Sequence, residues 1–216
     1  MVNLKINNIP VSVPEGTTIL EAARSVGIRI PTLCYLKEIN AIGACRICVV
    51  EVKGARSMVA ACVYPVAEGM EVTTNSAAVI KARKTTLELI LSDHQKKCLS
   101  CIRSTNCELQ NLANEYGCDA NAFEGATNEF QPDTSTDWLI RDNNKCILCR
   151  RCVAVCKHVQ EVGVISANKR GFSTNIDVAF QNGLENAGCV ACGQCINVCP
   201  VDAISFQYGF GRSEKQ

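Results

Sequence analysis

Two stretches of the chain read Cys146-Ile-Leu-Cys149-Arg-Arg-Cys152-Val-Ala-Val-Cys156 and Cys189-Val-Ala-Cys192-Gly-Gln-Cys195-Ile-Asn-Val-Cys199. Both have the spacing C-x2-C-x2-C-x3-C, and this duplication is the internal repeat of the sequence. Three cysteines at three-residue spacing suit three corners of a cubane cluster, with a fourth ligand supplied from a distance. Tetrahedral zinc sites typically use two C-x2-C pairs instead. The repeat therefore predicts iron–sulfur clusters and disfavours zinc.

The same spacing occurs in bacterial two-cluster ferredoxins, where the fourth cysteine of each run ligates the other cluster. That resemblance implies one [4Fe–4S] cluster on Cys146, Cys149, Cys152 and Cys199, and a second on Cys189, Cys192, Cys195 and Cys156. The second run keeps the proline of the bacterial pattern at Pro200, but the first has Lys157 in its place. The chain leaving Cys156 is thus less rigidly directed, although we expect ligation to survive.

A third set of cysteines lies nearer the N-terminus, at the spacing C-x10-C-x2-C-x13-C, and comprises Cys34, Cys45, Cys48 and Cys62. Small residues at Ala41, Gly43 and Ala44 allow the intervening loop to wrap closely around a cluster. Plant-type [2Fe–2S] ferredoxins use a loop of this kind with a shorter first spacing. The set predicts one [2Fe–2S] cluster, and the alternative is four free thiols on a small sheet.

A fourth set has the spacing H-x3-C-x2-C-x5-C and comprises His94, Cys98, Cys101 and Cys107. An isolated histidine is usually an ordinary surface or core residue, as we expect for His158, but His94 precedes three regularly spaced cysteines. Cys118 is a rival fourth ligand, and the spacing alone leaves that choice open. Neutral imidazole in place of a thiolate removes one negative charge, so it would raise the reduction potential of a [4Fe–4S] cluster.

The residues between the cysteines predict an α+β chain built from small modules. Alternating apolar residues predict strands at 2–6, 11–13, 48–52 and 57–61, and a helix capped by Thr17 or Thr18 and ending at Gly27. Further helices are expected at 77–92 and 107–116, a hairpin turning at 169–171, a strand at 201–206 and a frayed tail beyond it. The predicted domains are 1–76 for [2Fe–2S], 77–118 for the His-ligated cluster, a linker at 119–137, and 138–216 for two [4Fe–4S] clusters.

Composition narrows the functional class further. The chain has 216 residues, 16 cysteines and a formal net charge of +1. Neither a secretory leader nor an apolar run of eighteen residues opens or interrupts it, so we expect no membrane span and a reducing cytoplasmic location. A basic stripe interleaved with aromatics is also lacking, so nucleic acid is not an expected partner. That lack disfavours an iron–sulfur sensor that binds DNA.

With these ligands placed, the sequence resembles the cluster-bearing N-terminal region of the large iron–sulfur subunit of respiratory complex I. It is even more similar to the iron–sulfur subunit of NAD-linked hydrogenases and to the N-terminal part of multi-cluster [FeFe] hydrogenases. The matching stretches are Ile30-Pro-Thr-Leu-Cys34-Tyr, the Cys45-x2-Cys48 loop, His94 to Gln110, and Arg141-Asp142 leading into Lys145-Cys-Ile-Leu-Cys149. The resemblance implies a β-grasp fold for the [2Fe–2S] domain, and it favours His94 over Cys118.

The resemblance also implies the partners: a flavoprotein subunit that binds FMN and NAD(P)H, a small [2Fe–2S] subunit, and a hydrogenase or other catalytic subunit. No catalytic residue is expected, since every cysteine except Cys118 is assigned and no nucleotide-binding loop occurs. The expected function is electron relay in such a complex. The alternatives are the same role in an NAD-linked formate dehydrogenase or another bifurcating complex, and a free-standing polyferredoxin. Five basic residues, Arg150, Arg151, Lys157, Lys169 and Arg170, are candidate docking contacts.

Overall fold

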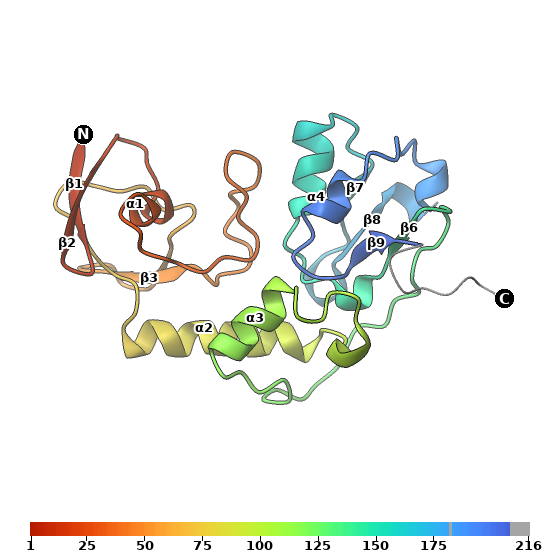
Figure 1. The fold of residues 1–216 in the computed structure, drawn as a ribbon, viewed down its shortest axis with the longest axis horizontal. Helices are drawn as coiled ribbons and strands as arrows, with labels where there is room; N and C mark the ends of the chain where they lie inside the picture. The colour runs from red at the N-terminus through yellow and green to blue at the C-terminus, as the bar shows by residue number, and fades with distance from the viewer. Residues whose placement is uncertain (182, 208–216) are drawn as a thin grey trace.

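The computed structural model describes residues 1–181 and 183–207, and it has three parts (Figure 1). A strand-rich N-terminal module lies at the left of the view and the cysteine-repeat module at the right. The helices α2 (Ala77–Ser92) and α3 (Glu108–Glu115) run below and join the two. The mixture of helix and strand in separate small modules confirms the α+β expectation.

The N-terminal module is a five-stranded sheet crossed by one helix, in the strand order β2-β1-β5-β3-β4. The elements are β1 (Val2–Ile6), β2 (Ile9–Val13), α1 (Ile19–Ser25), β3 (Val49–Val52), β4 (Val59–Ala60) and β5 (Glu71–Thr73). Thr18 caps α1 by accepting a hydrogen bond from the Glu21 amide, and α1 buries Ile19 and Leu20 against the sheet.

Strand β5 is the element that the sequence pattern did not reveal. It is three residues long and runs parallel to β1 and antiparallel to β3, so it lies between the β1–β2 pair and the β3–β4 pair. A run of three residues has too little alternation to indicate a strand by itself. Its partner strands, β1 and β3, lie far from it in the sequence, so β5 can pair only when the whole sheet has formed.

The predicted 77–92 helix is confirmed with the same bounds, because the Ser76 side chain accepts a hydrogen bond from the Val79 amide and starts α2 there. Val79, Leu87 and Leu91 are buried against the rest of the protein. Ile80 is apolar but 47% exposed, since it lies one position off the i, i+4 row that faces inward.

Residues 119–137 contain neither helix nor strand, as expected for a linker, but they are fixed to the parts on either side. The Asn128 amide donates to Asp93 at the end of α2, the Phe130 amide donates to Asn144, and Asp133 pairs with Arg141. The segment therefore belongs to the packed structure.

The C-terminal module contains two two-stranded antiparallel sheets, β6–β9 and β7–β8. Its strands and helices are β6 (Leu139–Arg141), α4 (Arg151–Ala154), β7 (Ile165–Asn168), β8 (Asn175–Val178), α5 (Gln194–Asn197) and β9 (Ile204–Phe206), with one π-helical turn, η3 (Val155–Val159), after α4. Its short 3-10 turns are η2 (Asn143–Lys145), η4 (Gly171–Ser173), η5 (Ala179–Gln181) and η6 (Leu184–Asn186), and η1 (Cys98–Ser100) lies between α2 and α3.

The predicted hairpin is the β7–β8 pair, where Lys169 and Gly171 both have φ of 60°. The strand expected at 201–206 begins only at Ile204, because Val201 to Ala203 pack into the core as a turn. The expected frayed tail falls largely on residues 208–216, outside the described residues.

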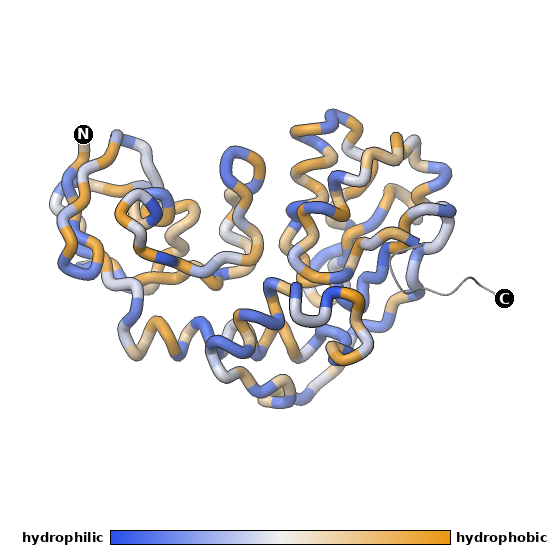
Figure 2. Tube along the Cα trace, in the orientation of Figure 1, coloured by the Kyte–Doolittle hydropathy of each residue, from blue (hydrophilic) through white to orange (hydrophobic). Residues whose placement is uncertain are grey.

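A shared core holds the three parts together. Leu33 and Ile47 come from the N-terminal module, Leu87 and Leu109 from α2 and α3, and Val201 from the C-terminal module. Every helix in the described part of the chain is too short or too polar to span a lipid bilayer. Figure 2 accordingly shows hydrophobic and hydrophilic residues interspersed along α2 and α3.

Candidate iron–sulfur centres

The four N-terminal cysteines lie together in the interior of their module. All four are buried, with exposed fractions of 1% for Cys34, 8% for Cys45, 1% for Cys48 and 0% for Cys62. Hydrogen bonds from Cys45 and Cys62 lower the pKa of the Cys34 thiol to about 2, and a hydrogen bond from Cys62 lowers that of Cys48 to about 7. The same hydrogen bonds raise the pKa values of Cys45 and Cys62. The four sulfur atoms are therefore close enough to share protons. A metal ligand must be a thiolate, so iron would displace the protons that Cys45 and Cys62 retain, and four sulfur atoms this close together fit one cluster.

The loop between Cys34 and Cys45 needs a glycine at position 43. Gly43 has φ of 63°, and a Cβ built there would lie 3.3 Å from Cγ2 of Val63. Both the backbone conformation and the lack of space disfavour a larger residue. The expectation that small residues let this loop wrap closely is thus met at Gly43.

The second set, His94, Cys98, Cys101 and Cys107, lines one cavity of about 180 Å³. Burial lowers the pKa of His94, which keeps the imidazole neutral as a metal ligand must be. The Nδ1 atom of His94 is buried and has no hydrogen-bond partner among the described residues. An unpaired buried imidazole nitrogen is unfavourable unless a metal or another group satisfies it, so this donor set also fits iron.

The rival ligand, Cys118, lies elsewhere. Its Sγ atom is 3.9 Å from the carbonyl oxygen of Lys84 on α2, and it packs against the core shared by α2 and α3. It does not line the cavity that contains His94. Burial raises the pKa of its thiol, which disfavours the thiolate form.

We expect His94→Ala to remove the cluster of the second set and Cys118→Ser to leave it in place. The reason is that His94 lines the same cavity as Cys98, Cys101 and Cys107. Iron content should fall by about four atoms per chain in the first variant and stay constant in the second. Low-temperature EPR of the reduced protein would show which signal is lost, and the opposite pattern would assign the ligand to Cys118.

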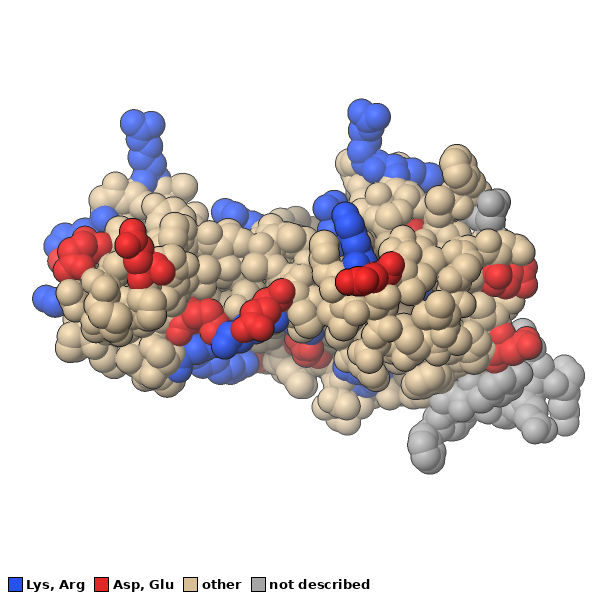
Figure 3. Space-filling model, turned by 90° about the horizontal axis from the view of Figure 1, so that it is seen from above, with Lys and Arg blue, Asp and Glu red and all other residues tan. Residues whose placement is uncertain are grey.

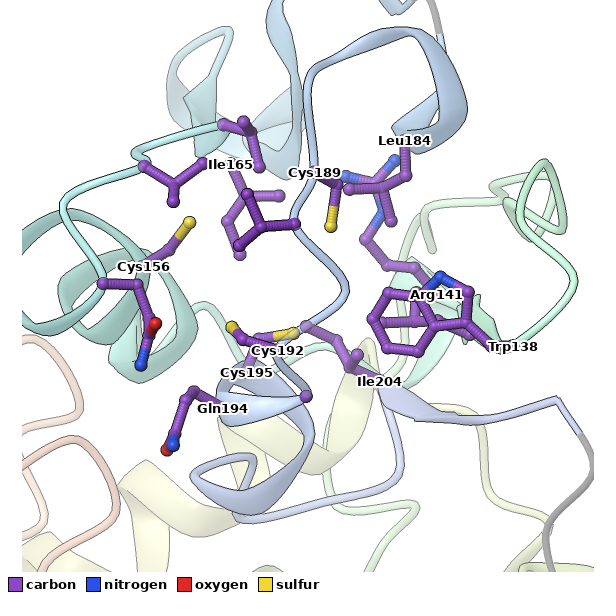
Figure 4. Close-up of a pocket in the computed structure, with 16 residues that line it drawn as sticks. Trp138, Arg141, Cys156, Ile165, Leu184, Cys189, Cys192, Gln194, Cys195 and Ile204 are labelled. Carbon is purple, nitrogen blue, oxygen red and sulfur yellow. The ribbon is translucent and has the colours of Figure 1, made fainter.

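The repeated cysteines line two separate cavities, and each cavity draws on both repeats. Cys146, Cys149, Cys152 and Cys199 line one. Cys156, Cys189, Cys192 and Cys195 line the other, and Figure 4 shows the labelled sulfur atoms turned toward the same space. Burial raises the pKa of Cys146 to about 11 and those of Cys149 and Cys195 to about 12, so iron must displace protons when it binds.

The two repeats have matching left-handed backbone positions. Leu148 and Arg150 have φ of 54° and 60°, and their counterparts Ala191 and Gly193 have φ of 54° and 72°. In the first repeat this conformation lets the Leu148 amide donate to the Cys146 sulfur at 3.4 Å. The loop thus turns a backbone donor toward sulfur, and such hydrogen bonds help to set a cluster's potential.

Among the residues described, no three His, Cys, Asp or Glu side chains converge as a single metal ion would require.

The cavity of Cys146, Cys149, Cys152 and Cys199 is linked directly to the two sets described before it. The Asn40 side chain donates to the carbonyl oxygens of Cys34 at 2.7 Å and of Cys149 at 3.1 Å. The thiol of Cys107 lies 3.8 Å from the carbonyl oxygen of Pro200, the residue after Cys199. These contacts bring the candidate sites of all three modules into one continuous structure.

Arg151 was a candidate docking residue, and that expectation is wrong. It is 6% exposed, and its guanidinium group donates two hydrogen bonds to Glu108 on α3, at 2.7 and 2.9 Å. The wrong expectation arose because Arg151 directly follows Arg150, which is exposed, whereas α4 turns the next side chain inward. Lys157, Lys169 and Arg170 are exposed, and Figure 3 shows basic and acidic side chains interspersed on one face.

Three protein-family models match the chain one after another. They are described as a 2Fe-2S iron-sulfur cluster binding domain at residues 1–77, an NADH-ubiquinone oxidoreductase-G iron-sulfur binding region at residues 83–121, and a 4Fe-4S dicluster domain at residues 145–203. Each model covers one of the parts described above and its candidate site. The chain is thus composed of the three kinds of iron–sulfur domain that these models describe. Iron–sulfur binding domains of both the 2Fe-2S and the 4Fe-4S type are therefore present.

Relatives of this iron–sulfur protein match nearly its full length. It is 45% identical over 94% of its length to the NADP-reducing hydrogenase subunit HndD of Solidesulfovibrio fructosivorans, and spans 36% of that protein. It is 39% identical over 94% of its length to the NADPH-Fe(3+) oxidoreductase subunit alpha of Geobacter sulfurreducens, and spans 24% of it. The chain is thus about a quarter to a third as long as these relatives.

A solved structure shares the whole fold. A chain of the NAD+-reducing [NiFe]-hydrogenase in its H2-reduced state superposes with a TM-score of 0.90 at 29% identity, covering 98% of this chain and 90% of that one. The arrangement of the modules is therefore that of a known hydrogenase chain.

Asn40, Glu108 and Arg141 form contacts around the candidate sites, but no spacing signal in the sequence indicated them.

Proposed function

We propose that the chain is an electron relay that holds one [2Fe–2S] and three [4Fe–4S] clusters in the ligand sets given above. It passes electrons between a flavoprotein subunit that binds FMN and NAD(P)H and a separate catalytic subunit, for which a hydrogenase is the best candidate. The observation that carries the proposal is that the candidate sites adjoin one another. Asn40 donates hydrogen bonds to the carbonyl oxygens of both Cys34 and Cys149. The thiol of Cys107 contacts the carbonyl oxygen of Pro200, which directly follows Cys199.

The bound clusters would supply one-electron transfer, and the chain's own residues determine where electrons enter and leave. Cys149 and Cys199 are buried in the core that the three parts share, whereas Cys192 is exposed. Next to the His94 site, the side chain of Leu99 is fully exposed. The central site is thus insulated from solvent, and peripheral sites are accessible to partner proteins.

The relatives support the choice of partners. Two proteins with hydrogenase in their names share this fold, one by 45% sequence identity and one by a TM-score of 0.90. Their names also refer to NADP or NAD+, which supports a nicotinamide-linked flavoprotein on one side of the relay. A small [2Fe–2S] subunit is the third partner that we propose.

The proposal can be tested on the protein isolated anaerobically from its source, with an affinity tag on this chain. We expect about fourteen iron atoms per chain, two from the [2Fe–2S] site and four from each [4Fe–4S] site. A flavoprotein and a hydrogenase should co-purify, and NAD(P)-linked reduction of a dye by the complex should require this chain. A colourless protein containing zinc, or a fully loaded monomer without partners, would contradict the proposal.

A further inference from the structure

We propose that Arg141 raises the reduction potential of both [4Fe–4S] sites in the C-terminal module, by its buried charge and by a hydrogen bond from its Nε–H group. The inference rests on the cluster ligands proposed above and adds a residue that binds no iron. Arg141 is the last residue of strand β6, and it is 3% exposed. A buried guanidinium group needs a hydrogen-bond acceptor for each of its nitrogens, and the Nε atom of Arg141 has none among the described residues.

Arg141 lines both cavities of the cysteine repeats. It appears in the wall formed with Cys146, Cys149 and Cys199, and again in the wall formed with Cys156 and Cys189. Figure 4 shows its side chain running beside Cys189 on the side of the cavity where Trp138 also lies. A single guanidinium group is therefore placed between the two candidate clusters.

The terminal nitrogens of Arg141 are fixed by other groups. Nη2 donates to Asp133 at 2.8 Å and to Asp177 at 2.6 Å, and Nη1 donates to the Ile176 carbonyl oxygen at 3.2 Å. Nε is buried and has no hydrogen-bond partner among the described residues. Because the guanidinium fork is planar and rigid, these contacts determine where Nε–H can point.

Cluster sulfur is the acceptor that suits this free donor, because sulfides and thiolates at an iron–sulfur site accept hydrogen bonds. Each [4Fe–4S] core takes up one electron and goes from a charge of about 2+ to about 1+, and no protein bond forms or breaks. A nearby cation and an N–H donor both stabilise the more negative reduced form. Burial strengthens these effects because the effective dielectric constant is low.

Arg83 provides a matched control inside the same chain. It is also 3% exposed, its Nε is also buried and unpaired, and its terminal nitrogens donate to Val49 and Tyr116. It does not line either cavity of the cysteine repeats. If the cluster potentials changed only because replacing a buried arginine loosens the packing, replacing Arg83 would change them as much as replacing Arg141.

The test is an EPR-monitored redox titration of the full-chain holoprotein, with dithionite as the reductant. We expect Arg141→Gln to lower the potentials of both C-terminal clusters, with about a tenfold fall in the reduced-to-oxidised ratio at fixed ambient potential, or about 59 mV for a one-electron couple. Arg141→Lys should lower them less, since it keeps the charge. Arg83→Lys should leave both unchanged.

A second variant tests the sign without removing the arginine. Asp177→Asn keeps the shape of the side chain but removes one of the two carboxylates that neutralise Arg141, so both potentials should rise. If Arg141→Gln loses iron, the reduction potentials measured for Asp177→Asn decide whether the proposal holds. Unchanged potentials in a fully loaded Asp177→Asn protein, or a shift confined to one cluster, would overturn the proposal. Co-purification of partners and total iron content would still test the relay function separately.

Discussion

Replacing Cys199 by serine should remove the same cluster as replacing Cys146, although the two residues belong to different repeats. Both line one cavity with Cys149 and Cys152, whereas Cys156 lines the other. Each single variant should lose about four iron atoms per chain, because a [4Fe–4S] cluster rarely survives without one of its four ligands. The iron count alone does not identify the cluster, so double variants are needed.

The double variants distinguish the two possible connectivities. Cys146→Ser with Cys199→Ser should lose no more iron than either single change, since both act on one site. Cys146→Ser with Cys156→Ser should lose about eight atoms, since these residues serve different sites. Cys118→Ser is the control, because that thiol lines neither cavity. The reverse pattern of losses would mean that each repeat completes its own cluster.

Truncating Glu108 should destabilise the protein far more than truncating Glu115, although both lie on α3 and both pair with an arginine. Glu108 is the partner of Arg151, and these side chains are 43% and 7% exposed, so the arginine is the buried member of the pair. Glu115 pairs with Arg29, and these side chains are 42% and 70% exposed. Removing Glu108 leaves the buried guanidinium group of Arg151 without its counter-charge, which costs about 3 kcal/mol, whereas an exposed pair contributes about 0.5 kcal/mol.

The comparison can be made by anaerobic thermal unfolding of the loaded protein. In a chain of this size 1 kcal/mol corresponds to about 3 °C, so Glu108→Ala should lower Tm by roughly 9 °C and Glu115→Ala by less than about 2 °C. Glu108→Gln should fall between them, because the amide still accepts a hydrogen bond from Arg151. Equal shifts in the two alanine variants would mean that the Arg151 pair contributes no more than a surface contact.

The parts of the structure that depend on short-range spacing were predictable. Helix α2 begins and ends where the sequence pattern indicated, and the predicted turn at 169–171 lies within the connection between β7 and β8. Each of the three ligand sets predicted for a [4Fe–4S] cluster lines a common cavity, although ligation itself stays a prediction. Strand β5 and the burial of Arg151 were not predictable, since both depend on partners far away in the sequence.

The amino-acid sequence alone determined the chemistry of this protein, because iron–sulfur ligation needs particular side chains at particular short spacings and those are visible without a fold. Tertiary structure alone decided how the sites are connected and what surrounds them. Asn40 meets Cys149, Glu108 meets Arg151, and Arg141 reaches two cavities only after the three modules have packed. Such contacts join residues that are distant in the chain, and no local pattern of residues encodes them.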